Sequence, residues 1–280
     1  MSHEGLMLLG FFPHEIEAIN NVKKFCGDKL WDESTIKTKW QNSRSHLSVK
    51  PTYTAGYPQV KEISIEHMDY LSTVPSHPSF QMIVKGPWAF RMVEIDPLLS
   101  LAIKVDSDYI ENLYLEFKDK AFENILSLIL PNKGGNLALS PSVNNFSWTT
   151  KDRGMHLQHT TSFPLVDGGI VVGFRVPIPP LPVHVKILHG KYILFDGYHR
   201  VLALRKAGHH YVPCLVSEVG SATEVQTMQE ESFNLRFLLE NENPPTMGHF
   251  FTDLSEKVQL LPSAKFFQIR AEDSYHILPK

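Results

Sequence analysis

Cysteine is scarce in this sequence: Cys26 and Cys214 are the two present, and they lie far apart. Without a paired spacing, they exclude a disulfide framework and a cysteine-based metal site. Both are predicted to be reduced thiols buried in a cytoplasmic protein. Long apolar stretches are missing as well, since no run reaches the roughly 18 residues of a membrane-spanning helix. The apolar run at residues 6–12 has no basic segment before it, so no signal peptide is expected.

The chain also lacks an excess of basic residues. It has 27 lysines and arginines against 30 aspartates and glutamates, which gives a formal net charge of −3. Proteins that bind nucleic acid over a wide surface usually carry a basic stripe. The densest basic stretch, residues 200–210, holds Arg200, Arg205 and Lys206 as its permanent cations. The charge balance therefore predicts that DNA or RNA is not the principal partner.

Hydrophobic residues make up 42% of the 280 residues and charged residues 20%, as is usual for a folded protein with a sizeable core. Helical spacing and alternation of apolar residues are both present. They predict helices at residues 14–25, 109–117, 120–130 and 232–239, and strands at 80–84, 88–95 and 170–176. Residues 28–57 are polar and are expected to be irregular. The mixture predicts an α+β (mixed α/β) fold.

The most informative stretch is a predicted hairpin that leads into a helix and a further strand. Two alternating runs, residues 183–188 and 191–195, flank a glycine that suits a tight turn. The sequence DGYHR at residues 196–200 then opens a helical pattern, and residues 211–219 form the next predicted strand. Backbone N–H groups and the helix dipole favour an anion at such a helix start. A phosphate site is therefore predicted there.

This order of elements resembles the core of the ParB/sulfiredoxin superfamily, over residues 179–219. In that family a glycine and a His-Arg or Glu-Arg pair open a helix that holds the phosphates of a nucleotide. The resemblance implies that Gly197, Tyr198, His199 and Arg200 bind the phosphates of ATP or a related nucleotide. Tyr198 stands where sulfiredoxin has its reactive cysteine, so sulfinic-acid repair is not implied. The second arginine and the Glu-Asn motif of the ParB CTPase have no clear counterpart here.

Asp196 and His199 are the candidate catalytic residues of this site, and a magnesium ion is expected to accompany a bound nucleotide. No ligand set for a resident metal is predicted. The alternative for Asp196 is to cap the helix or to orient Arg200. The alternative for His199 and Arg200 is a helix start without a ligand, whose side chains face solvent or pair with a carboxylate.

Two other groups of residues are weaker candidates. Arg153, His156 and His159 are expected to contribute to a substrate pocket, with an ordinary surface loop as the alternative. A metal bound by the two histidines would need a helix, which the neighbouring glycine and threonines oppose. Carboxylates near a predicted strand end, such as Asp96 and Asp106, could act in catalysis but also suit turns.

The predicted organisation has an N-terminal α/β region at residues 1–130 and a loop-rich seam at 131–160. A ParB/sulfiredoxin-like core follows at 161–240, and a C-terminal extension at 241–280. Three functions stay open. The first is a nucleotide-dependent enzyme, either an NTPase (a hydrolase) or a kinase-like phosphotransferase. The second is a non-catalytic sensor of a nucleotide or phosphorylated ligand. The third is a DNA-binding or nuclease protein, which the charge disfavours.

Overall fold

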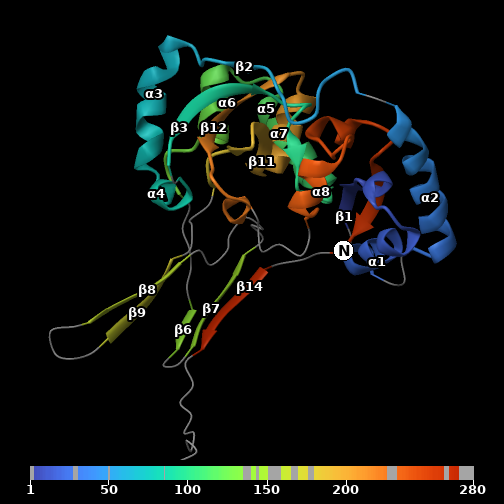
Figure 1. The fold of residues 1–280 in the computed structure, drawn as a ribbon. Coiled ribbons are helices and arrows are strands. Elements are labelled where there is room, and N and C mark those ends of the chain that lie inside the picture. Colours follow the sequence, from blue (N-terminus) through green and yellow to red (C-terminus); the bar gives the residue numbers. More distant parts are fainter. Residues whose placement is uncertain are drawn as a thin grey trace, which may run out of the picture. The chain divides into compact units, whose positions relative to one another are not determined.

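The computed structural model describes most of the chain, and Figure 1 traces its elements along the sequence. The described residues are 3–27, 31–49, 51–84, 86–134, 140–142, 145–150, 159–164, 170–175, 180–225, 232–261 and 265–270. They belong to two compact units: Met1–Lys133 with Leu181–Pro262, and Gly134–Pro180 with Ser263–Lys280. Helices and strands occur together in the first unit, so the predicted mixed α+β class is confirmed.

The first unit contains a six-stranded mixed sheet with the strand order β2-β3-β12-β10-β11-β4. In chain order its strands are β2 (Val60–Lys61), β3 (Trp88–Glu94), β4 (Leu99–Ser100), β10 (His184–Leu188), β11 (Lys191–Asp196) and β12 (Tyr211–Glu218). β10 and β11 form the predicted hairpin, and β12 runs parallel to β10. β3 pairs with β12 in antiparallel fashion. One sheet therefore joins strands from the N-terminal part of the chain to the hairpin.

A second sheet in this unit has the order β13-β1-β5, with β1 at His3–Met7, β5 at Lys104–Asp106 and β13 at Glu256–Leu260. The α-helices of the unit are α1 (Glu15–Cys26), α2 (Glu33–Ser45), α3 (Met68–Thr73), α4 (Phe80–Ile83), α5 (Ser107–Phe117), α6 (Phe122–Ile129), α7 (Tyr198–Lys206) and α8 (Leu235–Glu240). α1 packs against α2 and β13, and α5 packs against α7 (Figure 1). The predicted helices at residues 14–25, 109–117, 120–130 and 232–239 are thus confirmed, with shifted ends.

Short 3₁₀ turns connect several of these elements. They are η1 (Leu9–Phe11), η2 (His46–Ser48), η3 (Ile65–His67), η4 (Val74–Ser76), η5 (Ala222–Glu224) and η6 (Met247–Phe251). Thr246 is the N-cap of η6. Its side chain accepts from the backbone N–H of His249, and the His249 ring accepts from the Thr246 N–H. This reciprocal pair is a capping box in which histidine takes the usual place of a glutamate or glutamine.

Two predictions about secondary structure are wrong. Residues 80–83 form helix α4 and not a strand. The segment 80–84 is too short, with four apolar residues and one glutamine, for its pattern to distinguish a helix from a strand. The Phe80 ring packs edge-on against Trp88 at 5.1 Å, so contacts with β3 decide the conformation. Residues 28–57 include helix α2, whose polar sequence buries Ile36 as its only fully covered apolar side chain. Asp32 caps α2 by accepting from the Thr35 N–H at 2.8 Å, and this cap was the missed signal.

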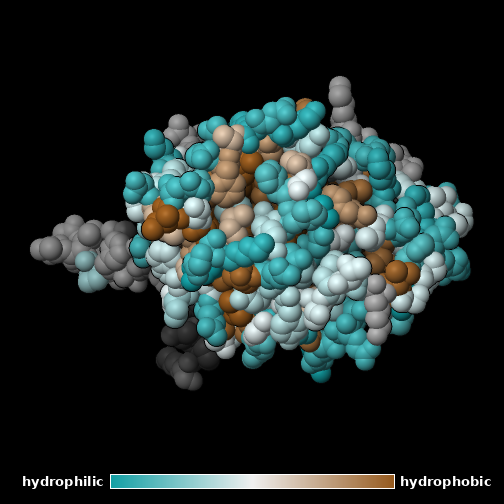
Figure 2. Space-filling model, turned by 90° about the horizontal axis from the view of Figure 1, so that it is seen from above, coloured by the Kyte–Doolittle hydropathy of each residue, from teal (hydrophilic) through white to brown (hydrophobic). Residues whose placement is uncertain are grey.

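Both cysteines are free and buried, as predicted. Burial raises the pKa of the Cys26 thiol to about 11 and raises that of Cys214 further, so neither is a reactive thiolate. Among the described residues, no helix is both long and apolar enough to cross a membrane. On the face drawn in Figure 2, apolar residues form small patches separated by hydrophilic ones. Patches of that size are ordinary on a protein surface.

The second unit is described through its strands. β6 (Ser140–Ser142), β7 (Asn145–Thr150) and β14 (Lys265–Arg270) form an antiparallel sheet, and β8 (His159–Pro164) pairs with β9 (Ile170–Arg175). The predicted strand at residues 170–176 is confirmed. β6 and β7 lie inside the segment that composition predicts as loop-rich. Their pairing with β14, more than a hundred residues later, is a long-range contact that local composition does not reveal.

Candidate functional site

The chain enters α7 through a left-handed glycine, as the sequence predicts. Gly197 has φ 95° and stands at the N-cap of α7, directly after β11 ends at Asp196. A Cβ at this position would lie 2.6 Å from Cγ2 of Val183, so the turn needs glycine for its conformation and for space. No side chain among the described residues caps α7. The first N–H groups of a helix have no acceptor within it, so this end suits an anion.

Arg200 is held by a neighbouring helix. Its Nη1 donates to the carbonyl oxygens of Leu128 at 3.2 Å and Ile129 at 3.4 Å, which lie in the last turn of α6. Its Nη2 is 3.9 Å from Oδ2 of Asp196, and the side chain is 14% exposed. Carbonyl groups at a helix C-terminus have no partner in their own helix and attract a cation. Arg200 therefore joins α7 to α6 in the described structure.

His199 contacts the start of α5. Its Nε2 accepts from the backbone N–H of Asp106 at 3.0 Å, and its ring lies 5.2 Å from that of Tyr109. Because Nε2 is the acceptor, the neutral imidazole carries its proton on Nδ1. Asp106 itself caps α5 by accepting from the Tyr109 N–H at 3.0 Å. The sequence predicts the phosphate role of His199 but not this contact, which joins residues 93 positions apart.

Tyr198 points into the core. Its hydroxyl accepts from the Leu101 N–H at 3.3 Å and donates to the carbonyl of Leu194. Burial raises the pKa of this hydroxyl, so it stays protonated. What Tyr198 can offer to a ligand at the start of α7 is its backbone N–H. Its side chain fixes the helix to β11 and to the segment after β4.

Of the residues predicted to contribute to a substrate pocket, only His159 is among those that the structure describes. Arg153 and His156 lie outside the described residues. His159 begins β8 in the second unit, and its backbone pairs with Arg175. The predicted contribution of these residues to a substrate pocket stays a prediction. In the described part of the chain, no three histidine, cysteine or acidic side chains lie together as metal ligands would.

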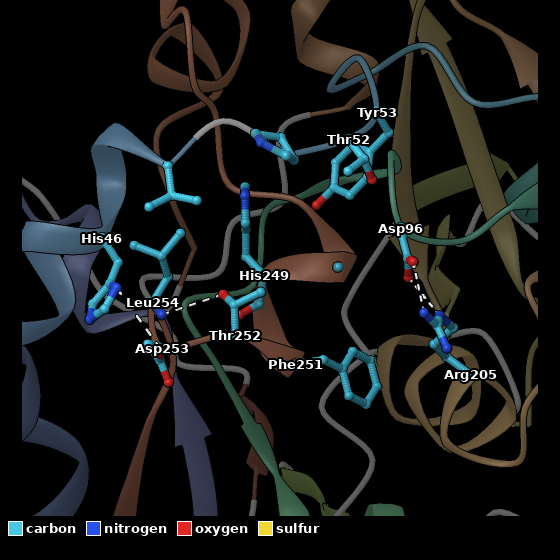
Figure 3. A pocket seen from close by; sticks show the side chains of 13 residues that line it. His46, Thr52, Tyr53, Asp96, Arg205, His249, Phe251, Thr252, Asp253 and Leu254 are labelled. Atoms are coloured by element: carbon cyan, nitrogen blue, oxygen red, sulfur yellow. Dashed lines mark hydrogen bonds and ion pairs between the residues drawn. The ribbon is translucent and has the colours of Figure 1, made fainter.

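A cavity of about 350 Å³ lies at the opposite end of α7 (Figure 3). Four segments far apart in the sequence surround it: η2 with the residues after it, the chain at Asp96, Arg205 of α7, and η6 with the residues after it. Asp96 accepts from Nε and Nη2 of Arg205 at 2.8 and 2.9 Å, so the two side chains form a bidentate ion pair. This pair raises the pKa of Arg205 further, which keeps the guanidinium charged.

Tyr53 and His249 form the polar wall of the cavity (Figure 3). The Tyr53 hydroxyl lies 2.7 Å from Oγ1 of Thr246, and burial raises its pKa to about 12. His249 accepts at Nδ1 from the Thr246 N–H at 3.0 Å, so its proton sits on Nε2. Burial lowers the pKa of His249 to about 4, which makes the ring a neutral donor near pH 7.

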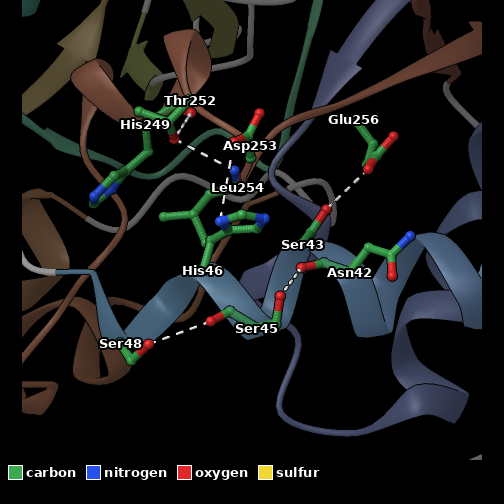
Figure 4. A network of polar contacts seen from close by, with 10 residues as sticks. All are labelled: Asn42, Ser43, Ser45, His46, Ser48, His249, Thr252, Asp253, Leu254 and Glu256. Carbon is green, nitrogen blue, oxygen red and sulfur yellow. Dashed lines mark hydrogen bonds and ion pairs between the residues drawn. The ribbon is translucent and has the colours of Figure 1, made fainter.

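A polar network supports the wall formed by α2 and η2 (Figure 4). Ser43 donates to Oε1 of Glu256 at 3.2 Å, which connects α2 to β13. Nδ1 of His46 lies 3.9 Å from Oδ2 of Asp253 across the rim of the cavity. The Thr252 hydroxyl donates to the His249 carbonyl at 3.0 Å. These contacts connect α2 to β13, η2 to the residues after η6, and Thr252 to η6. They therefore fix the part of the cavity wall that η2 and η6 form.

Sequence reasoning missed most of this cavity. From the sequence, Asp96 is interpreted as a catalytic carboxylate or a turn residue, and Arg205 only as one of the permanent cations of residues 200–210. Tyr53 and His249 were not singled out at all. The local signal that could have found His249 was its position three residues after Thr246, the spacing of a capping box at the start of η6. The other lining residues come together only in the folded chain.

Comparison of the chain with family models finds no match, and comparisons with curated proteins and with solved structures find none either. The ParB/sulfiredoxin resemblance therefore stays a prediction that rests on the residues and on the order of the elements. What the geometry offers at the start of α7 is a helix N-terminus entered through glycine. At the other end of α7 the structure has a cavity lined by a charged donor, Arg205, and a neutral donor, His249.

Proposed function

We propose that this protein binds a nucleotide, or another phosphorylated small molecule, at the N-terminus of α7. The observation that carries the proposal is the left-handed Gly197 at a helix start that no described side chain caps. Phosphate oxygens accept hydrogen bonds at such a helix end, and the dipole favours their charge. The order of hairpin, α7 and parallel strand β12 supports the same interpretation.

In the first form of the proposal the protein is an enzyme for phosphoryl transfer or nucleotide hydrolysis. Asp196 and His199 are then its catalytic candidates, with magnesium accompanying the nucleotide. Asp196 has a partly exposed carboxylate next to Gly197. His199 would use Nε2 as a base, and it would first release the Asp106 N–H from that atom. Catalysis thus requires a local rearrangement at the start of α5.

In the second form the protein is a sensor that binds without turnover. The hydrogen bonds of Arg200 to the end of α6 favour this form, because a phosphate would compete with those carbonyls for the guanidinium. α6 ends at Ile129, and the second unit begins at Gly134. Binding at Arg200 would therefore act on the segment that leads into the second unit. Nucleic acid is not proposed as the partner, because of the charge balance.

A thermal-shift screen of nucleotides, with and without magnesium, tests the proposal. A nucleotide at about 100 times its Kd stabilises the folded chain by roughly 2.7 kcal/mol, a readily detected shift. Release of inorganic phosphate from the best nucleotide then separates the enzyme from the sensor. The absence of a shift with every nucleotide tested at millimolar concentration would contradict both forms.

Arg200→Lys is the variant that localises the site. It keeps a cation for the α6 carbonyls but loses the planar fork, so phosphate affinity should fall about 30-fold or more. Arg236→Lys is the matched control, since Arg236 is 81% exposed on α8 and pairs with Glu240. Calorimetry with the best nucleotide measures both. Equal affinity in the two variants would assign the start of α7 to structure alone.

A further inference from the structure

The cavity at the end of α7 is bordered by a buried histidine whose second ring nitrogen donates to no described residue. His249 is 5% exposed, and its Nδ1 is occupied by the Thr246 N–H. The other ring atom, Nε2, has no hydrogen-bond partner among the described residues, although the ring borders the cavity (Figure 3). Nε2 is therefore a donor on an otherwise buried ring, and water or a ligand in the cavity can accept from it.

Arg205 adds a second set of donors to the same cavity. Asp96 takes up Nε and Nη2, while Nη1 has no hydrogen-bond partner in the part of the chain that the structure describes. The guanidinium lies 5.7 Å from the ring of Phe251, which borders the cavity and is 47% exposed. An exposed phenyl ring beside a fixed arginine offers a flat apolar surface next to a cation.

The carboxylates around the cavity disfavour a ligand that carries more than one negative charge. Asp96 already offsets much of the charge of Arg205, and the carboxylate of Asp253 stands at the rim. A phosphate dianion would meet both carboxylates with one partly neutralised cation to hold it. A carboxylate carries one charge and fits the planar edge of an arginine.

We propose that this cavity binds a small aromatic carboxylate. Its carboxylate accepts from Arg205, its ring packs on Phe251, and a second oxygen accepts from Nε2 of His249. The volume of about 350 Å³ is within the usual range for small-molecule sites. Val49 and Leu254 add apolar side chains to the lining of the cavity. This site is independent of the nucleotide site proposed at the other end of α7.

Calorimetry with 4-hydroxybenzoate tests the proposal, because that molecule carries a carboxylate, a ring and a second oxygen. Its neutral amide, 4-hydroxybenzamide, is the matched ligand control. We expect the acid to bind and the amide to bind at least about tenfold more weakly, since the charge-assisted bond to Arg205 is lost. No heat from the acid up to about 10 mM, or equal binding of acid and amide, would overturn the proposal.

Two substitutions at residue 249 separate ligand binding from folding. His249→Asn keeps an oxygen near the position of Nδ1, so the bond from the Thr246 N–H survives while the donor at Nε2 is removed. His249→Gln places an amide donor near the position of Nε2. We expect the affinity for 4-hydroxybenzoate to fall about fivefold or more in the first variant and less in the second. The reverse order would overturn the role of His249.

Phe251→Ala and Arg205→Lys complete the test, with Arg236→Lys as the control outside the cavity. The first two should each weaken binding of 4-hydroxybenzoate about tenfold, and the control should leave it unchanged. Inorganic phosphate is the competing ligand. Tighter binding of phosphate than of the acid at these residues would overturn the carboxylate assignment. Loss of 4-hydroxybenzoate binding in Arg200→Lys alone would move the site to the start of α7 and also overturn it.

Discussion

The two ends of α7 use their arginines in different ways. At the start, Arg200 donates to the backbone carbonyls of α6. In the last turn, Arg205 donates to Asp96 from two nitrogens and lines a cavity. The sequence points to the start of α7 through the motif at residues 196–200, whereas no motif points to the cavity at its end. The comparison teaches that a motif can point to a helix end without revealing which contacts its side chains make.

The difference also concerns how each end is built. The start of α7 depends on one tightly packed glycine, with α5 and α6 held by single side chains. The cavity at the other end depends on several segments that meet there, and a polar network fixes one wall (Figure 4). A substitution at the start should therefore lower stability as well as nucleotide affinity, while one at the cavity should act mainly on binding in the cavity.

Gly197→Ala should lower the free energy of unfolding by about 2–5 kcal/mol. The left-handed conformation costs a non-glycine residue about 1–2 kcal/mol, and the close contact with Val183 adds about 1–3. Gly208→Ala is the control at the other end of the helix, where φ is 91° and no atom lies within 4 Å of the new Cβ. That control should lose only about 1–2 kcal/mol. Equal losses in urea unfolding would contradict the tight packing at Gly197.

Acid should destabilise the cavity end through His249. Its pKa is lowered to about 4 by burial, whereas an unfolded histidine titrates near 6.5. The unfolded chain therefore binds the proton first, and stability is lost as pH falls from about 6.5 to 4, by at most about 3 kcal/mol from this residue. His184, whose pKa burial lowers to about 3, acts with the same sign.

The measurement for this prediction is urea unfolding at pH 7 and pH 4.5 for the natural protein and for His249→Asn. The loss of stability between the two pH values should be smaller in the variant, because asparagine does not titrate. Carboxylates and His184 contribute equally to both proteins and cancel in the difference. A variant that loses as much stability as the natural protein would show that His249 is not buried in its neutral form.

Arg200→Ala should lower the free energy of unfolding by about 1–2 kcal/mol, because the end of α6 loses its donor. Arg236→Ala is the control, since its ion pair with Glu240 is highly exposed and should change stability by less than about 0.5 kcal/mol. Chemical unfolding compares the two. If both variants are as stable as the natural protein, Arg200 does not hold α6, and its side chain is available for a phosphate.

Phe251→Ala should have the smallest effect on stability, within about 0.5 kcal/mol, because nearly half of the side chain is exposed. The same variant is expected to bind 4-hydroxybenzoate about tenfold more weakly. Thermal unfolding without ligand, beside calorimetry with it, checks both statements on one protein. A large loss of stability would make the ring part of the core and would remove the contrast between the two ends of α7.

The elements that were predicted correctly are those in which apolar residues recur at a clear helical or strand spacing. Apolar residues at helical spacing predicted α1 and α6, and the alternation on either side of Gly190 predicted the hairpin. Helix α4 was mistaken for a strand because its five-residue run fits both periods until the Phe80 ring is placed against Trp88. Helix α2 was missed because its sequence is polar and its apolar face is narrow.

The sequence by itself determined the mixed α+β class, the turn at Gly197 and the buried, unreactive cysteines. These follow from local chemistry: glycine tolerates a positive φ, periodic apolar residues define faces, and an apolar strand buries its thiol. The tertiary structure alone decided where the side chains of the motif point and that a cavity exists. Asp96, Arg205 and His249 lie far apart in the chain, and only the packing of η6 beside α7 brings them together (Figure 3).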